Sequence, residues 1–119
     1  MTLKPANLYR QLPSLNSGET FQELWRQANL RVELIQSSDS PLPDLYDQEQ
    51  DEWVLLLEGR ALLEVNGQPL ALGPGDHLVI PAHTPHRVLE THPEPRCLWL
   101  AVHLHPHPLI EGGPAPGAP

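Results

Sequence analysis

The chain has few of the features that mark membrane, nucleic-acid-binding or disulfide-linked proteins. Its longest apolar runs, such as Trp53 to Leu57, are far shorter than the roughly 20 residues that cross a bilayer, and the N-terminus has no apolar stretch of signal-peptide length. The 7 Lys and Arg residues form no cluster, which speaks against a nucleic-acid partner. A single cysteine, Cys97, excludes an internal disulfide and fits a reducing compartment. We therefore expect a cytoplasmic protein that binds neither membrane nor nucleic acid.

Histidine is absent from the first 76 residues, although the chain contains 7 histidines. They are His77, His83, His86, His92, His103, His105 and His107. Imidazole is a common metal ligand and general base near neutral pH. The segment from residue 77 to residue 107 is therefore the first place to look for chemistry.

Turn residues are abundant, with 15 prolines and 8 glycines among 119 residues, and they separate short apolar stretches. Asn66-Gly67 between two such stretches is a strong hairpin signal. Many short strands with frequent turn signals are typical of an all-β sandwich or barrel. The predicted strands cover residues 30–36, 53–57, 60–65, 68–72, 77–80, 86–90 and 97–105.

One short helix is predicted over residues 17–28, near the N-terminus. Asn16 and Glu19 have the spacing of a capping box. The apolar residues Phe21, Leu24, Trp25 and Ala28 follow at helical spacing. The predicted organisation is an arm and helix over residues 1–29, a barrel over 30–105 and a disordered tail over 106–119, which is rich in proline and glycine.

Two segments resemble the motifs of the cupin superfamily. Glu52 to Gly59 is similar to the second half of the first cupin motif, and Gly75 to His86 is similar to the second motif. The resemblance implies a jelly-roll β-barrel that is open at one end. It also implies that two histidines and a glutamate of the first motif, with one histidine of the second, hold a divalent first-row metal such as Fe, Mn, Ni or Zn.

Carried over by position, the resemblance assigns metal-ligand roles to His86 and Glu52. The places of the paired histidines fall on Tyr46 and Gln48, or on Leu45 and Asp47 at a longer spacing, so neither register contains a histidine. Tyr46, Gln48 and Glu52 share parity and point to one face of an extended chain. Gln48 then offers a carbonyl oxygen as a ligand, and the set becomes rich in oxygen. The alternative is a barrel without metal that binds a small molecule through hydrogen bonds alone.

Two further histidines are candidates with alternatives. His83 takes a glycine place of the second motif, where it either supplies a nitrogen ligand or lies on the rim of the pocket. His103 shares one face of the last strand with Trp99, whereas the other face is apolar throughout. We expect the apolar face to fill the barrel and His103 to point outward, and the reverse orientation brings His103 into the pocket.

Two functions remain from different classes. One is a metal-dependent enzyme of small-molecule metabolism, of oxygenase or isomerase type, in which Glu52 is a ligand or a general base and Tyr46 donates a proton or a hydrogen bond. The other is a sensor or binding module that performs no chemistry, because the fold hosts many activities. An apolar N-terminal arm and a two-sided last strand also predict a homodimer, formed by exchange of arm or edge-strand contacts.

Overall fold

A computed structural model describes residues 2–10, 12–42 and 44–110 of the chain. Within these ranges it is built from strands and contains no helix long and apolar enough to cross a membrane. The strands are β1 (Glu19–Gln27), β2 (Leu30–Ser37), β3 (Asp51–Glu58), β4 (Arg60–Val65), β5 (Gln68–Leu72), β6 (His77–Ile80), β7 (His86–His92) and β8 (Cys97–Leu104). The all-β prediction is confirmed.

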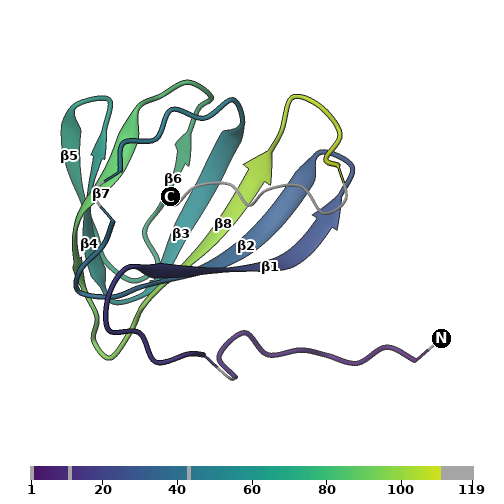
Figure 1. Ribbon diagram of the computed structural model, residues 1–119, viewed down its shortest axis with the longest axis horizontal. Coiled ribbons are helices and arrows are strands. Elements are labelled where there is room, and N and C mark those ends of the chain that lie inside the picture. Colours follow the sequence, from purple (N-terminus) through teal and green to yellow (C-terminus); the bar gives the residue numbers. More distant parts are fainter. Residues whose placement is uncertain (1, 11, 43, 111–119) are drawn as a thin grey trace.

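The strands form two antiparallel sheets that face each other and enclose the core (Figure 1). The larger sheet has the order β1-β2-β8-β3-β6, and the smaller has the order β5-β4-β7. Strands β3 and β4 follow each other in sequence but lie in different sheets, so the chain crosses from one sheet to the other at Gly59. The core between the sheets includes Ile35, Val54, Leu56, Leu63, Val88 and Trp99.

The hairpin predicted at Asn66-Gly67 joins β4 to β5. Both residues have positive φ angles, 52° and 80°, as a two-residue type I′ turn requires. Asparagine and glycine adopt this conformation at low cost, because asparagine tolerates the left-handed region and glycine has no side chain.

The predicted helix over residues 17–28 is wrong, because this segment forms the edge strand β1. A β-bulge between Glu23 and Trp25 shifts the register, so Phe21 packs against the core whereas Trp25, four residues later, is 55% exposed. Because of the bulge, Phe21 and Trp25 do not share one face, as the predicted helix would require. Glu19 caps no helix and instead accepts a hydrogen bond from Ser37 Oγ on β2, at 2.7 Å.

The orientation expected for the last strand is also wrong. Trp99, Ala101 and His103 of β8 are fully buried and point into the barrel. Leu104, on the opposite face, is 47% exposed. The expectation assumed that an apolar face always turns inward. It fails here because one end of the barrel interior is lined by polar side chains.

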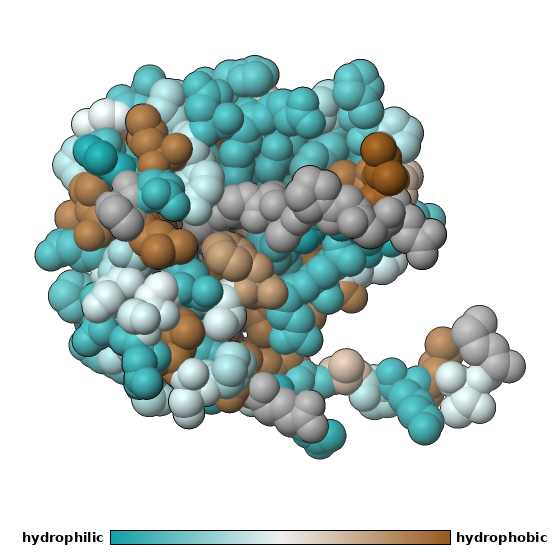
Figure 2. Space-filling model, viewed as in Figure 1, coloured by the Kyte–Doolittle hydropathy of each residue, from teal (hydrophilic) through white to brown (hydrophobic). Residues whose placement is uncertain are grey.

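The two ends of the chain differ in their contacts with the barrel. Residues 2–10 form an arm that stands clear of the barrel (Figures 1 and 2). At the other end, the backbone amide of Leu109 donates to Ala28 O at 2.8 Å and that of His105 donates to Asn29 O at 2.9 Å, so residues 105–110 are tied to the turn between β1 and β2. The remainder of the predicted disordered tail, 111–119, lies outside the described residues.

Candidate functional site

A row of polar residues lines the inner face of the five-stranded sheet at one end of the barrel. Arg31 of β2, His103 of β8 and Glu52 of β3 are neighbours in register across the three central strands. Glu52 and His103 have no exposed surface, and Arg31 is 4% exposed. Farther along β3 the inward residues are Val54 and Leu56, which belong to the apolar core. The buried charged side chains and the buried histidines are thus concentrated at one end of the barrel, which we call the mouth.

Glu52 faces His86 of the opposite sheet across the mouth. The carboxylate oxygen Oε1 of Glu52 lies 3.7 Å from Nε2 of His86, and both side chains are buried. The other ring nitrogen of His86, Nδ1, lies 2.9 Å from the carbonyl oxygen of Thr84. Only a protonated Nδ1 can donate to that carbonyl, so the contact assigns the proton to Nδ1 and turns Nε2 toward Glu52.

Burial of the Glu52 carboxylate is energetically unfavourable. Neither of its oxygens has a hydrogen-bond partner among the described residues. Burial raises the pKa of the Glu52 carboxyl well above its ordinary value, and the nearby carboxylate of Glu33 raises it further. A buried acidic group without hydrogen bonds destabilises the fold unless something else compensates it. Such an arrangement is a candidate for a functional site.

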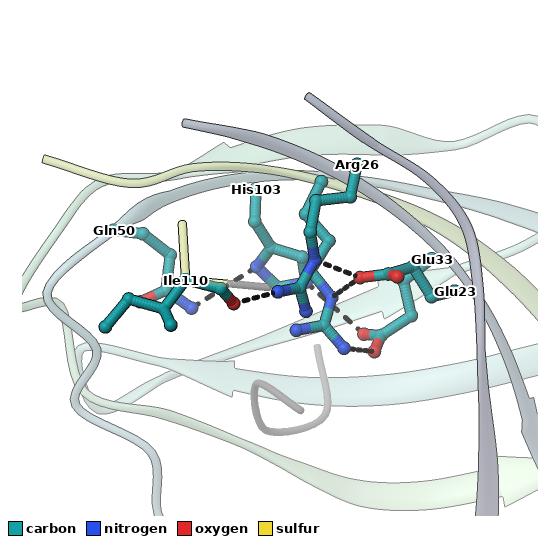
Figure 3. Close-up of polar contacts among 7 residues, drawn as sticks. Glu23, Arg26, Glu33, Gln50, His103 and Ile110 are labelled. Atoms are coloured by element: carbon teal, nitrogen blue, oxygen red, sulfur yellow. Dashed lines mark hydrogen bonds and ion pairs between the residues drawn. The ribbon is translucent and has the colours of Figure 1, made fainter. Parts of the chain in front are cut away.

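A second buried pair lies beside the first, and Figure 3 shows its partners. Nε2 of His103 lies 3.4 Å from Oε1 of Glu33, and Nδ1 of His103 lies 3.3 Å from Nε2 of Gln50. Both ring nitrogens of His103 are therefore engaged. Arg31 completes the group, with its guanidinium 3.5 Å from Glu33 and 3.2 Å from Glu23.

Arg31, Glu33 and Gln50 also belong to this interior, and none of them was predicted from the sequence. Arg31 and Glu33 alternate with apolar residues on β2, and such a pattern normally places the charged residues outside. A signal for Gln50 was present, because it has the same parity as Gln48 and Glu52. Exposure alternates along this segment, with Gln50 and Glu52 buried and Asp51 exposed.

Tyr46 and Gln48 lie on the segment that leads into β3. The backbone of Tyr46 forms an isolated bridge with His86, with N–O distances of 2.8 and 2.9 Å, and the two rings lie 5.9 Å apart. Nε2 of Gln48 is buried without a hydrogen-bond partner among the described residues. Tyr46 is thus held directly beside the imidazole of His86.

His83 lies away from these groups. It has a positive φ of 57°, and its ring contacts the exposed carboxylate of Asp47 at 3.2 Å. Its side chain is 72% exposed. The backbone thus adopts the left-handed conformation that favours glycine at this motif position, and the side chain faces solvent. The thiol of Cys97 is not a candidate nucleophile, because burial raises its pKa to about 12.

A groove of about 530 Å³ lies at the surface between the C-terminal segment and the loop before β3. Its lining includes Arg26, Glu49, His105, Leu109 and Ile110. The ring of His105 lies 6.1 Å from that of His103, so the groove adjoins the buried polar interior. Burial lowers the pKa of the His105 imidazole, and the neighbouring His103 and Arg31 lower it further.

The donor set at Glu52 and His86 fits a divalent metal ion in part. Two donors that each lie about 2.1 Å from a shared ion can be separated by up to about 4.2 Å, which accommodates the observed 3.7 Å. Donation by a metal-binding histidine to a backbone carbonyl is also typical of such sites. However, no three His, Cys, Asp or Glu side chains among the described residues form a group able to hold a metal. Further donors would therefore be neutral oxygens. The ring of Tyr46 lies 5.9 Å from that of His86, and Gln48 is half-buried on the segment that leads to Glu52.

Known proteins resemble this chain in sequence and in fold. A family model described as "Cupin domain" matches residues 32–103. A candidate mannose-6-phosphate isomerase from Ralstonia eutropha JMP134 is 39% identical, with 87% of this chain and 99% of that chain covered and a TM-score of 0.77. No curated protein sequence matches the chain significantly.

More distant solved structures share the fold. A cupin superfamily protein from Desulfitobacterium hafniense DCB-2 is 20% identical, with 88% of this chain and 94% of that chain covered and a TM-score of 0.71. An RmlC-like cupin from Shewanella frigidimarina NCIMB 400 is 16% identical, with 86% and 91% covered and a TM-score of 0.68.

Proposed function

Because this chain belongs to the cupin domain family, we propose that its barrel mouth binds an uncharged polar small molecule beside a divalent first-row metal ion held by His86 and Glu52. The observation that carries the proposal is the contact between Glu52 and His86. With its proton on Nδ1, the histidine directs the lone pair of Nε2 at a carboxylate oxygen 3.7 Å away, which is too far for a hydrogen bond. A cation between the two groups is within reach of both donors, and it compensates the carboxylate of Glu52, whose oxygens have no hydrogen-bond partner among the described residues.

The charge balance of the interior supports the same proposal. Glu33 and Glu52 are buried carboxylates, and the buried guanidinium of Arg31 already contacts Glu33 and Glu23. Glu23, Glu33 and Glu52 together with Arg31 carry a net charge of −2, and a dication at Glu52 neutralises this charge. Buried charges are tolerated only when they are paired. An oxygen-rich set favours ions such as Mn²⁺ or Fe²⁺ over tightly held copper.

The same charges bear on the substrate. The Ralstonia relative is described by a reaction on a phosphate ester. In this chain a phosphate dianion would meet Glu33 and Glu52, while Arg31 is already shared by two carboxylates. We therefore propose a neutral hydroxy-carbonyl compound, such as a sugar without phosphate, which approaches through the groove beside His105.

Within this proposal the residues around the mouth have distinct roles. A bound divalent ion supplies a Lewis acid that polarises a carbonyl or hydroxyl oxygen of the ligand. Thr84 fixes the tautomer of His86, and Tyr46, held beside His86, offers its phenol to the ligand as a hydrogen-bond donor or proton source. Residues of the C-terminal segment and of the loop before β3 line the groove through which the ligand approaches.

A second function is favoured by the raised pKa of Glu52. A carboxyl group whose pKa is shifted toward neutrality is suited to proton transfer, as an aldose–ketose isomerisation requires. In this case Glu52 acts as a general base without metal. The two functions differ in one measurable property, which is the dependence of ligand binding or turnover on added metal.

The test is a titration of chelator-treated protein with Mn²⁺, followed by the loss of the free-ion EPR signal. We expect about one ion per chain, and at least a tenfold weaker affinity in both His86→Ala and Glu52→Gln. His92→Ala, which alters an exposed histidine at the end of β7, serves as the matched control and is expected to bind like wild type. Mn²⁺ binding that survives both mouth substitutions contradicts the ligand set. Absence of binding, with an isomerase activity that needs no metal and is lost in Glu52→Gln, supports the second function.

A further inference from the structure

The groove beside His105 is lined by both apolar and polar side chains. Its apolar residues are consecutive and belong to the C-terminal segment, namely Pro108, Leu109 and Ile110. Its polar residues include Arg26 of β1 as well as His105 itself. The volume of about 530 Å³ falls within the range of sites that hold small molecules. The groove is therefore large enough to bind part of a ligand and not only to admit one.

Hydrogen bonds fix the apolar part of this lining in place. The backbone amide of Leu109 donates to the turn between β1 and β2 at 2.8 Å, and Nη1 of Arg26 donates to the carbonyl oxygen of Ile110 at 2.6 Å (Figure 3). At the inner end, His105 N donates to Asn29 O at 2.9 Å and Asn29 Nδ2 donates to His105 O at 3.0 Å. The side chain of Ile110 is nevertheless 81% exposed. An apolar surface that is already ordered loses little entropy when a ligand covers it.

One buried polar atom of the groove lacks a partner. Nε2 of His105 is buried and accepts or donates no hydrogen bond within the described part of the chain. Burial lowers the pKa of this imidazole, and the nearby His103 and Arg31 lower it further, so the ring is uncharged near neutral pH. A hydroxyl or carbonyl-hydrate oxygen of a ligand can both donate and accept, so it satisfies Nε2 in either tautomer.

The charges around the groove disfavour an ionic group in it. An anion would meet the carboxylate of Glu49 and the chain's net charge of −8. The guanidinium of Arg26 offers it little compensation, because its Nε already lies 2.7 Å from Oε1 of Glu23. A cation would lose hydration beside Leu109 and Ile110. The groove therefore suits an uncharged group.

The groove connects to the mouth through His103. The ring of His105 lies 6.1 Å from that of His103, and His103 is the register neighbour of Glu52 on the adjacent strand. Because adjacent strands lie about 4.8 Å apart, the inner end of the groove is on the order of 10 Å from Glu52. A molecule that binds at Glu52 thus needs a chain of several carbon atoms to reach the apolar lining.

We propose that this groove is a second binding subsite, which takes an uncharged apolar chain carried by the molecule bound at the mouth. The inference rests on the proposed function, because it assigns the chain to the same ligand. The hydroxy-carbonyl end of the ligand lies toward Glu52, an oxygen near the junction forms a hydrogen bond with His105, and the chain lies along Leu109 and Ile110. The ligand class is thereby narrowed to hydroxy-carbonyl compounds with an apolar chain.

The test is isothermal titration calorimetry of the full chain saturated with Mn²⁺. The probes are hydroxymethyl ketones that carry a methyl, pentyl or heptyl group. Complete burial of one methylene group raises affinity by a factor of about four, and burial in a groove open to solvent on one side raises it by less. We expect the heptyl ketone to bind at least about tenfold more tightly than the methyl ketone, with a negative heat-capacity change that marks apolar burial.

Two variants of the apolar lining test where the chain lies. Ile110→Ser changes a largely exposed side chain, so the barrel tolerates it, and Leu109→Ser changes its half-buried neighbour. In both, the gain from methyl to heptyl should fall below about threefold. The matched control is Leu89→Ser, which alters a 37% exposed leucine on the smaller sheet and should keep the full gain. Circular dichroism and the thermal transition verify that each variant is folded.

The outcomes separate this inference from the proposed function. Equal affinities for the three ketones, with binding that depends on Mn²⁺, overturn the subsite and leave the proposed function standing; the groove then serves another occupant, such as a protein segment. A gain with chain length that persists in both Ile110→Ser and Leu109→Ser also overturns the subsite. A gain that is lost in both variants but needs no Mn²⁺ supports the subsite and contradicts the metal site. Failure of all three ketones to bind overturns both.

Discussion

Glu52 and His86 reach the same point from opposite sheets, with Oε1 of one 3.7 Å from Nε2 of the other and both side chains buried. Strand β3 of the larger sheet carries Glu52, and strand β7 of the smaller sheet carries His86. The contact spans the interior where the barrel would otherwise contain apolar side chains. The contact therefore lowers the stability of the folded chain while it forms the candidate site.

Glu52→Gln should stabilise the protein in the absence of metal. The folded state raises the pKa of Glu52, so it binds this proton more tightly than the unfolded state does. The contribution of Glu52 to stability is thus fully present below its unfolded pKa of about 4.5 and is lost as pH rises through the folded value. We expect a gain on the order of 1 kcal/mol at pH 8 and a smaller gain near pH 5, measured by urea denaturation in chelator. With saturating metal the order should reverse, because only wild type gains binding energy. An equal effect at both pH values would contradict this account.

His83→Ala should leave metal affinity unchanged within a factor of about two, in contrast to the loss of at least about tenfold expected for His86→Ala. The two histidines are separated by three positions, but the side chain of His83 is 72% exposed whereas that of His86 is 1% exposed. The same Mn²⁺ titration distinguishes them. A loss of affinity in His83→Ala as large as that in His86→Ala would mean that the loop turns inward when metal binds.

Gly59→Ala should destabilise the fold much more than Gly67→Ala. Both glycines have positive φ, 86° and 80°, so each alanine carries a similar backbone cost of about 1 kcal/mol. A Cβ at Gly59 would lie 2.6 Å from the carbonyl oxygen of Arg96, whereas a Cβ at Gly67 meets open space. We expect an additional loss of about 2 kcal/mol or more for Gly59→Ala, measured by chemical denaturation. Equal losses would show that the chain crossing at Gly59 can shift to make room.

Arg31→Met should cost about 3–5 kcal/mol of unfolding free energy, because it leaves Glu33 buried beside Glu52 without its cation. The control is Arg87→Met, which breaks the partly exposed pair with Glu64 and should cost less than about 1 kcal/mol. Denaturation of both variants at one pH gives the comparison. Similar losses would indicate that Arg31 contributes through packing of its methylene groups rather than through charge.

The sequence was sufficient to predict most of the strands. The runs over residues 60–65, 68–72 and 77–80 were predicted with the bounds that the structure has. Their signals are local, since turn residues such as Asn66-Gly67 end one strand and begin the next. The edge strand β1 was not predictable in this way, because its apolar residues happen to have the spacing of a helix, whereas the bulge places Phe21 and Trp25 on opposite faces of the strand.

The candidate site was predictable only where the motif resemblance extends. Glu52 and His86 were named from the motifs, and they lie together in the structure. Glu33 and Arg31 were not found, because a charged residue that alternates with apolar ones on a strand is normally taken to face solvent. Which face of β2 and β8 turns inward depends on how the two sheets pack together, and a single strand does not carry that information.

The apolar layer beneath the polar row has a consequence for the size of the ligand. Val54 lies two residues deeper than Glu52 on β3, a distance of about 6.6 Å, and it has no exposed surface. Leu56 and Trp99 close the interior below it. This layer acts as a floor, so a molecule that reaches Glu52 cannot extend further into the barrel and must accommodate any additional length toward the groove. Ligands of graded length should therefore show a sharp limit in one direction and tolerance in the other.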